Sequence, residues 1–118
     1  MAKGRIFRQA WIDGVNKHFP GEPKPGYVSP WEEMPDWEQA SAEAVYEQVE
    51  AFVRISGGQT RRLSREQKGR FVATCWVAQI YKHISDPKPA YVAEWEGLPE
   101  WQQETDADIF EVIEGQVK

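Results

Sequence analysis

The chain has very few of the residues from which small proteins build covalent or metal-linked cores. Among its 118 residues there is one cysteine, Cys75, and there are two histidines, His18 and His83. A single thiol cannot form an internal disulfide, and these three side chains cannot complete a closed zinc shell without distant carboxylates. The composition therefore predicts a fold that relies on its hydrophobic core, with no metal and no cofactor.

Long apolar stretches and an excess of positive charge are missing as well. No apolar run reaches the length of about 18 residues that indicates a membrane-spanning helix, and no apolar targeting segment is recognisable. The formal net charge is -5, whereas a nucleic-acid-binding protein usually presents a strongly basic face. These absences predict a cytoplasmic protein with no membrane partner, and they argue against a nucleic acid partner.

Aromatic residues are abundant, and the tryptophans reveal an internal duplication. The six tryptophans form three pairs that are 65, 64 and 64 positions apart, namely Trp11 with Trp76, Trp31 with Trp95, and Trp37 with Trp101. Residues 4–18 align with residues 69–83, and after a slip of one position residues 23–37 align with residues 87–101. A chain of this length has room for one core, so we expect the two copies to pack on each other as a single domain, residues 1–118.

Each copy is predicted to be a helix, an aromatic loop and a second helix. Apolar residues at helical spacing predict the first helix at residues 3–18, and the capping-box pair Ser64 and Gln67 starts its counterpart at residues 64–84. Pro35 and Pro99 suit the first turn of the second helices. The buried stripes of the second helices are expected to be Val45, Val49, Phe52 and Val53 in one copy and Ile109, Val112, Ile113 and Val117 in the other.

The sequence thus predicts a mainly α fold of two pseudo-symmetric helix-loop-helix repeats, with four main helices. Repeat one covers residues 4–55, the connector residues 56–63 and repeat two residues 64–118. We expect short extended segments in the loops at residues 27–28 and 91–92. Gly57 and Gly58 follow a predicted helix, where glycine ends helices, and do not form a phosphate-binding loop after a strand. With the histidines at equivalent positions and no nucleophile-base pattern, the sequence predicts a protein that is not an enzyme.

Charged and aromatic residues leave alternatives open. Lys17, His18, Lys82 and His83 end the first helices, where they either complement the helix dipole or supply positive charge to a shared cleft. Tyr27, Trp31, Tyr91 and Trp95 lie in the loops, where they either anchor the loop or line a pocket. The helix tryptophans, Trp11, Trp37, Trp76 and Trp101, are expected in the core.

The loop of the second copy also has a recognisable pattern. It reads Tyr-Val-x-x-Trp-Glu-x-Leu-Pro-x-Trp over residues 91–101 and is followed by the polar helix of residues 102–109. Together with a tryptophan-bearing first helix, this pattern resembles the repeat of the ryanodine-receptor domain, including its bacterial and phage versions. The resemblance implies paired repeats of two antiparallel helices, with short extended segments, and a role in sensing small or nucleotide-like ligands.

Two functions follow as hypotheses. In the first, the protein is a non-catalytic binding protein that senses or sequesters a small anionic, nucleotide-like ligand in bacteria or phage. The loop aromatics would then stack on the ligand, and the lysines and histidines above would meet its negative charge. In the alternative, the protein is a protein-protein interaction or structural module, and it could form a homodimer. The eight candidate contact residues are Lys17, His18, Tyr27, Trp31, Lys82, His83, Tyr91 and Trp95.

Overall fold

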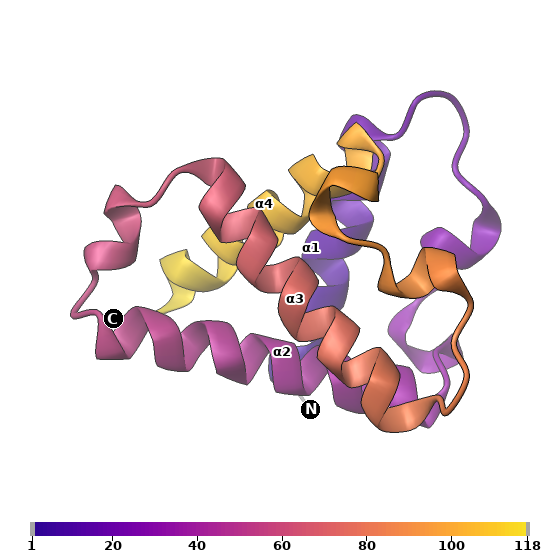
Figure 1. Ribbon diagram of the computed structural model, residues 1–118, viewed down its shortest axis with the longest axis horizontal. Coiled ribbons are helices and arrows are strands. Elements are labelled where there is room, and N and C mark those ends of the chain that lie inside the picture. The colour runs from indigo at the N-terminus through magenta and orange to yellow at the C-terminus, as the bar shows by residue number, and fades with distance from the viewer. Residues whose placement is uncertain (1, 118) are drawn as a thin grey trace.

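The computed structural model describes residues 2–117, which form four α-helices joined by 3-10 turns (Figure 1). The α-helices are α1 (Ala2–His18), α2 (Asp36–Ile55), α3 (Arg65–His83) and α4 (Glu100–Gln116). The 3-10 turns are η1 (Pro25–Tyr27), η2 (Trp31–Glu33), η3 (Gln59–Arg62), η4 (Pro89–Val92) and η5 (Trp95–Gly97). The predicted mainly α class with four main helices is therefore confirmed.

The helix ends follow from local sequence. The Ser64 hydroxyl accepts a hydrogen bond from the Gln67 amide, and the Gln67 side chain accepts one from the Ser64 amide, so the predicted capping box is present. Pro35 and Pro99 are the N-cap residues of α2 and α4. Gly58 follows α2 at φ 85°, a left-handed conformation that glycine adopts without the steric cost of a Cβ atom.

The loops differ from the prediction. Residues 27–28 and 91–92 are not extended, and no strand occurs anywhere between residues 2 and 117. They belong instead to the ends of 3-10 turns, in which the Tyr27 amide donates to the Lys24 carbonyl and the Tyr91 amide to the Lys88 carbonyl, both at 2.9 Å. A proline at the start of each turn holds φ near the value that a 3-10 turn needs.

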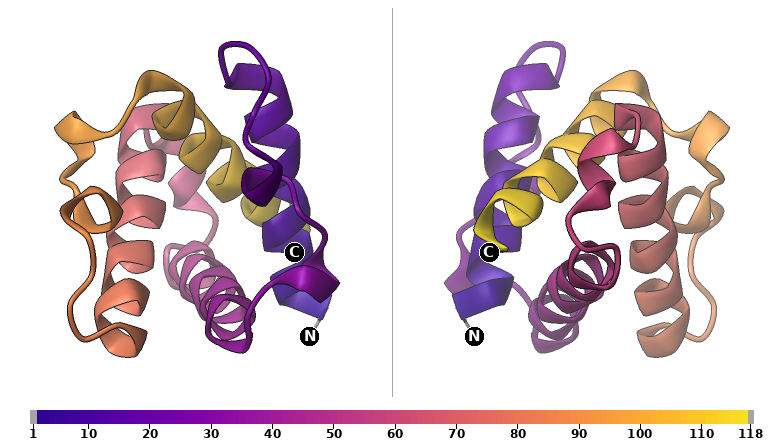
Figure 2. Two further views of the ribbon diagram at one scale, coloured as in Figure 1. Left: turned by 90° about the vertical axis from the view of Figure 1, so that its right-hand side faces the viewer. Right: turned by 90° about the vertical axis from the view of Figure 1, so that its left-hand side faces the viewer.

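The core forms where the four helices meet. α1 packs on α2 and α4, and α3 packs on α4 and α2, so each half contacts the other through both of its helices. Both aromatic loops lie at one end of the molecule and the connector lies at the opposite end (Figures 1 and 2). In the stripe predicted for α4, Ile109 and Ile113 are fully buried, but Val112 is exposed and Phe110 takes its place in the core.

The same contacts recur in the two halves. The Trp31 ring covers Gly4 and the Trp95 ring covers Gly69, so closely that a Cβ atom on either glycine would lie 2.5 Å from the ring. The equivalent hydrogen bonds are Gln39 to the Trp31 carbonyl and Gln103 to the Trp95 carbonyl, and the equivalent ion pairs are Arg5 with Glu32 and Arg70 with Glu96. These contacts therefore occur at aligned positions of the two halves.

The tryptophans divide differently from what we expected. Trp31, in a loop, is buried in the core, because the missing glycine side chain on α1 leaves room for its ring. The four helix tryptophans, expected in the core, are only partly buried and line a cavity. Gly4 and Gly69 therefore set the position of the loop rings, while Trp11 and Trp76 pack against the core and also line the cavity.

Substituting Gly69 tests this close contact. We expect Gly69→Ala to lower the free energy of unfolding by about 1–3 kcal/mol, because the new Cβ atom overlaps the Trp95 ring and also approaches the Gln103 carbonyl. Gly115→Ala is the control, since nothing lies within 4 Å of its Cβ position and alanine favours helix by up to about 1 kcal/mol. Denaturant unfolding of both variants should therefore show changes of opposite sign, and equal changes would contradict the contact.

Candidate ligand-binding cavity

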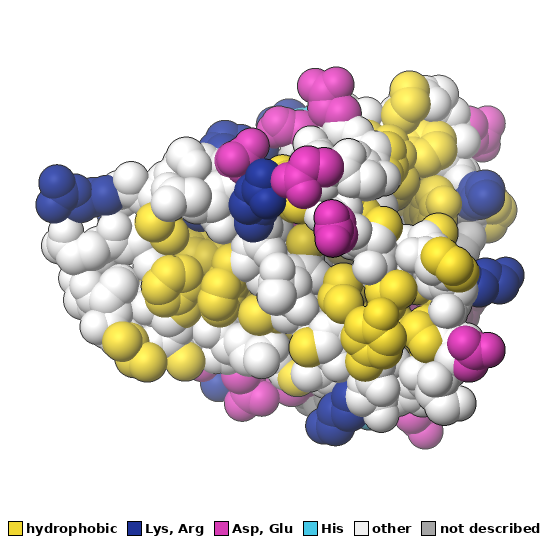
Figure 3. All heavy atoms as spheres, in the orientation of Figure 1, with side chains coloured by type: hydrophobic (Ala, Val, Ile, Leu, Met, Phe, Trp, Pro, Cys, Tyr) yellow, Lys and Arg dark blue, Asp and Glu magenta, His cyan; other side chains and the backbone are white. Residues whose placement is uncertain are grey.

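A cavity of about 580 Å³ opens between the two halves, beside the aromatic loops. This volume lies within the range of about 300–1,000 Å³ that is typical of small-molecule sites. Hydrophobic side chains also gather on the surface over this end of the molecule (Figure 3). Both members of eight aligned pairs line the cavity: Phe7 and Val72, Arg8 and Ala73, Trp11 and Trp76, Gly26 and Ala90, Tyr27 and Tyr91, Met34 and Leu98, Trp37 and Trp101, Glu38 and Gln102. The cavity is therefore built from equivalent parts of both repeats.

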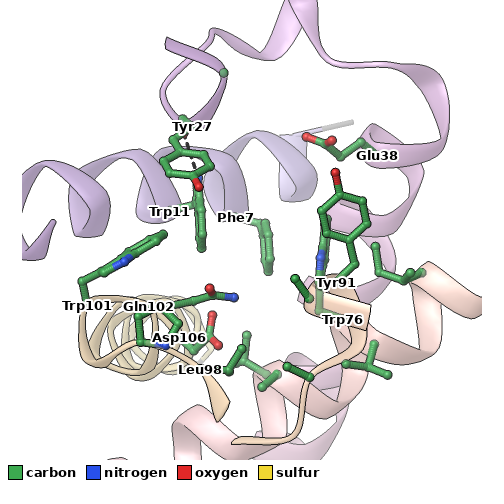
Figure 4. Close-up of a pocket in the computed structure, with 18 of the residues that line it drawn as sticks. Phe7, Trp11, Tyr27, Glu38, Trp76, Tyr91, Leu98, Trp101, Gln102 and Asp106 are labelled. Atoms are coloured by element: carbon green, nitrogen blue, oxygen red, sulfur yellow. Dashed lines mark hydrogen bonds between the residues drawn. The ribbon is translucent and has the colours of Figure 1, made fainter. Parts of the chain in front are cut away.

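Aromatic rings form two sides of the cavity (Figure 4). On one side Trp101 makes edge contacts with Trp11, at 5.8 Å between ring centroids, and with Phe19, at 5.0 Å, and it lies 5.6 Å from Tyr27. The Trp11 indole donates a hydrogen bond to the Tyr27 carbonyl at 2.8 Å, which ties the first loop to α1. We call Trp11, Phe19, Tyr27 and Trp101 the aromatic wall.

The opposite side is more open. Phe7 stacks on Trp76 with centroids 5.6 Å apart and planes 13° from parallel, and Tyr91 stands beside Trp76 (Figure 4). Tyr91 is 53% exposed, so its ring forms part of the rim where the cavity meets solvent. Flat rings on both sides leave a space whose walls suit a planar or apolar body.

Asp106 is the exceptional residue of the cavity. Its side chain rises from α4 and points into the cavity beside Gln102 (Figure 4), although the residue is only 6% exposed. Its carboxylate gains no hydrogen bond or charge contact among residues 2–117, and its oxygens are not among the polar atoms that are fully closed off from solvent. Burial without a partner raises the pKa of Asp106 well above its ordinary value of 3.8. A buried polar group without a partner is costly, which makes it a candidate contact for a ligand.

A second charged group lies near the loops. The Arg8 guanidinium donates to the Ser29 and Gly26 carbonyls and lies 3.9 Å from the Glu38 carboxylate. Burial lowers the pKa of Arg8, and burial raises the pKa of Glu38, which the Arg8 charge partly offsets. Arg8 is thus tied to the first loop through Nε and Nη2, whereas its Nη1 atom faces Glu38 without a hydrogen bond.

The cavity is symmetric in its rings but not in its charges. The alignment places Ala42 opposite Asp106, Ala73 opposite Arg8 and Gln102 opposite Glu38. Ala42 is fully buried, so the equivalent position of the other half packs without a carboxyl group. Packing at the equivalent position of the other half therefore does not require an acid.

The structure brings together only some of the residues predicted as ligand contacts. Tyr27 and Tyr91 line the cavity, whereas Trp31 and Trp95 do not, because their rings cover the glycines of the first helices. The remaining predicted contacts, Lys17, His18, Lys82 and His83, lie outside it.

These four residues lie away from the cavity and contact other side chains. His18 Nε2 lies 2.7 Å from an Asp108 carboxylate oxygen, and Lys17 borders a shallow depression with Asp108 and Glu111. Lys82 and His83 are exposed at the end of α3, where the His83 ring lies 6.2 Å from the Trp37 ring. The structure therefore does not gather these cations in a shared cleft.

Sequence reasoning missed Arg8, Glu38 and Asp106, yet a signal for Asp106 was present. Asp106 lies three and seven positions before Ile109 and Ile113, so it falls on the buried stripe of α4. An acid within such a stripe, opposite an alanine in the other copy, indicates a buried carboxyl. Arg8 similarly follows Phe7 on an otherwise apolar face.

Other potential reactive groups do not form a site. Burial raises the pKa of Cys75 to about 11, so its thiol stays protonated at neutral pH and is a poor nucleophile. Among residues 2–117 no cluster of His, Cys, Asp and Glu is arranged to hold a metal ion. In the same part of the chain, no helix has the length and apolarity to cross a membrane.

Comparison of the chain with models of known families, with characterised proteins and with solved structures found no match. The function is therefore argued from the cavity itself.

Proposed function

We propose that this protein is a non-catalytic binding protein that holds one small organic molecule in the cavity between its two repeats. The observation that carries the proposal is the Asp106 carboxyl, which is buried, unpaired and directed into an aromatic cavity of about 580 Å³. A ligand that hydrogen-bonds this carboxyl would satisfy it, while the aromatic wall would bury the apolar part of the ligand.

The lining also changes our expectation of the ligand. A nucleotide-like anion was expected because Lys17, Lys82 and the two histidines could meet its phosphate, but none of them lines the cavity. The single cation of the lining, Arg8, already binds loop carbonyls. We therefore propose a planar or apolar ligand without a phosphate group.

The wider context stays a proposal as well. The loop pattern that resembles the ryanodine-receptor repeat, and the cavity between two such repeats, support a pseudo-symmetric pair of repeats that senses or sequesters its ligand. A single free cysteine suits a cytoplasmic protein, and the resemblance of the loop pattern implies an origin in bacteria or phage.

Native mass spectrometry of the protein after incubation with a metabolite extract tests the function. We expect one small molecule bound per chain, and we expect Ala73→Phe to abolish binding because Ala73 lines the cavity and a phenyl ring would fill it. Ala78→Phe is the control, since Ala78 is exposed on the same helix and lies outside the lining.

Two outcomes would contradict the proposal. Retention of the same small molecule by Ala73→Phe would place its site elsewhere. Recovery of a stoichiometric protein partner or a homodimer, with no small molecule in any preparation, would favour the interaction module. The exposed Tyr91 at the rim would then be the first residue to test as a protein contact, by Tyr91→Ala.

A further inference from the structure

We infer that the cavity selects an organic cation, whose positively charged group binds the carboxylate of Asp106. This inference rests on the proposed function and adds the chemical class of the ligand.

The charges of the lining favour a cation. Two carboxyl groups, Asp106 and Glu38, face one guanidinium, Arg8, and the other titratable groups are the phenols of Tyr27 and Tyr91. From α3 the lining receives only apolar and aromatic side chains. With both acids ionised, the formal charge of the lining is -1. An anion would approach two carboxyl groups, whereas a cation would neutralise the site. Two further cations, Lys24 and Lys88, are not part of the lining but lie over the rings of Tyr27 and Tyr91, at 5.8 and 6.0 Å from the ring centroids.

The guanidinium of Arg8 already contacts the first loop and Glu38. Its Nε donates to the Ser29 carbonyl at 3.1 Å, and one terminal nitrogen donates to the Ser29 carbonyl at 2.8 Å and to the Gly26 carbonyl at 3.3 Å. The other terminal nitrogen faces Glu38 at 3.9 Å. Arg8 therefore partly neutralises Glu38 from the loop side and leaves Asp106 without a cationic partner.

The rings around Asp106 add to the same preference. Trp11, Trp101 and Trp76 border the cavity, and the electron-rich face of an indole attracts a cation within about 6 Å of its centroid. An ammonium group held at Asp106 would lie among these rings, while an attached apolar body would fill the space between the aromatic wall and Tyr91. A site of this kind combines a carboxylate with cation-π contacts.

Protonation gives the inference a distinctive signature. The carboxyl of Asp106 is protonated over an extended pH range because burial raises its pKa, so a cation can pair with it only after this proton has left to solvent. Affinity for a cation should therefore rise with pH, by about tenfold per pH unit while Asp106 is protonated in the free protein, and then level off. A neutral ligand that accepts a hydrogen bond from the protonated carboxyl would show the opposite trend.

Three indoles of nearly equal shape separate these cases in calorimetric titrations of the full chain between pH 4 and pH 8. Tryptamine carries an ammonium group, tryptophol a hydroxyl and indole-3-acetate a carboxylate. We expect tryptamine to bind at least about tenfold more tightly than tryptophol at pH 8, with indole-3-acetate the weakest. We also expect tryptamine affinity to rise with pH, whereas tryptophol affinity should not.

Two variants test whether the carboxyl of Asp106 causes the preference for tryptamine and its pH dependence. Asp106→Asn should reduce tryptamine affinity to that of tryptophol and remove the pH dependence. Asp108→Asn, two residues further along α4 and outside the lining, should keep both. Comparable affinity of wild-type protein for tryptamine and tryptophol, with binding lost in Ala73→Phe, would overturn the cation inference and keep the proposed function. Absence of binding for all three probes, or binding that survives Ala73→Phe, would count against the cavity itself.

Discussion

Lys68→Met should lower the free energy of unfolding by about 3–5 kcal/mol, because it leaves a buried carboxylate without its partner. Lys68 Nζ lies 3.0 Å from Glu114 and 3.3 Å from Glu111, and the Lys68 side chain is only 6% exposed. The other Glu114 carboxylate oxygen is buried and has no hydrogen-bond partner among the described residues. Methionine keeps the length of the side chain that packs beside Phe110, so the loss should report the charge rather than a cavity.

The other half of the molecule supplies the control for this prediction. Lys3 occupies the position equivalent to Lys68 and pairs with Glu50 at 2.9 Å, but its side chain is 42% exposed. Solvent screens such a pair, so Lys3→Met should change stability much less. Chemical denaturation of both variants measures the difference. Equal losses would show that the burial of Lys68 and Glu114 does not distinguish the two halves.

Asp106→Ala should stabilise the protein at neutral pH by about 1–3 kcal/mol, the usual cost of a buried polar group without a partner. The equivalent position of the other half is Ala42, which is fully buried, so alanine is compatible with this packing. The same change should abolish ligand binding. A residue that lowers stability and supports binding is a common feature of functional sites.

The pH dependence of stability provides the second measurement on this variant. The pKa of Asp106 is higher in the folded protein than its ordinary value of 3.8, so the folded state binds the proton more tightly. The contribution of Asp106 to the free energy of unfolding should therefore fall as the pH rises from about 4 to its folded-state pKa, whereas carboxylates with a lowered pKa, such as Glu50 and Asp108, contribute in the opposite sense. Asp106→Ala should lack this fall. A variant that is less stable than wild type at pH 7, with an unchanged pH profile, would show that Asp106 has a structural role.

Much of the fold could be predicted from sequence because it depends on local rules. The capping box at Ser64 and the prolines before α2 and α4 act within one turn of chain, and their effects are present as expected. The internal match of the tryptophans also indicated the two halves. The loop conformation could not be read in the same way, since two residues with strand preference, Tyr27 and Val28, follow a proline that starts a 3-10 turn instead.

The site was harder to predict, because it depends on how the two halves meet. The tryptophans at helical positions were expected in the core, whereas those in the loops could either anchor the loop or line a pocket. In the structure, the Trp31 ring fills the space above Gly4 of α1, and this contact between the loop and the helix could not be read from the sequence. Trp11 is then left at the cavity. In the same way, the lysines and histidines at the helix ends pointed to a cationic cleft, whereas the cavity places Asp106 at its centre.

The six indole N–H groups offer the most direct test of the claim that the cavity is the binding site. In a ¹H–¹⁵N correlation spectrum of the labelled protein, titration with tryptamine should shift the indole signals of the four tryptophans that line the cavity, Trp11, Trp37, Trp76 and Trp101. The signals of Trp31 and Trp95, which cover the glycines of the first helices, should stay in place. Shifts confined to Trp31 and Trp95, with the cavity signals unchanged, would contradict the account and return the binding site to the loops.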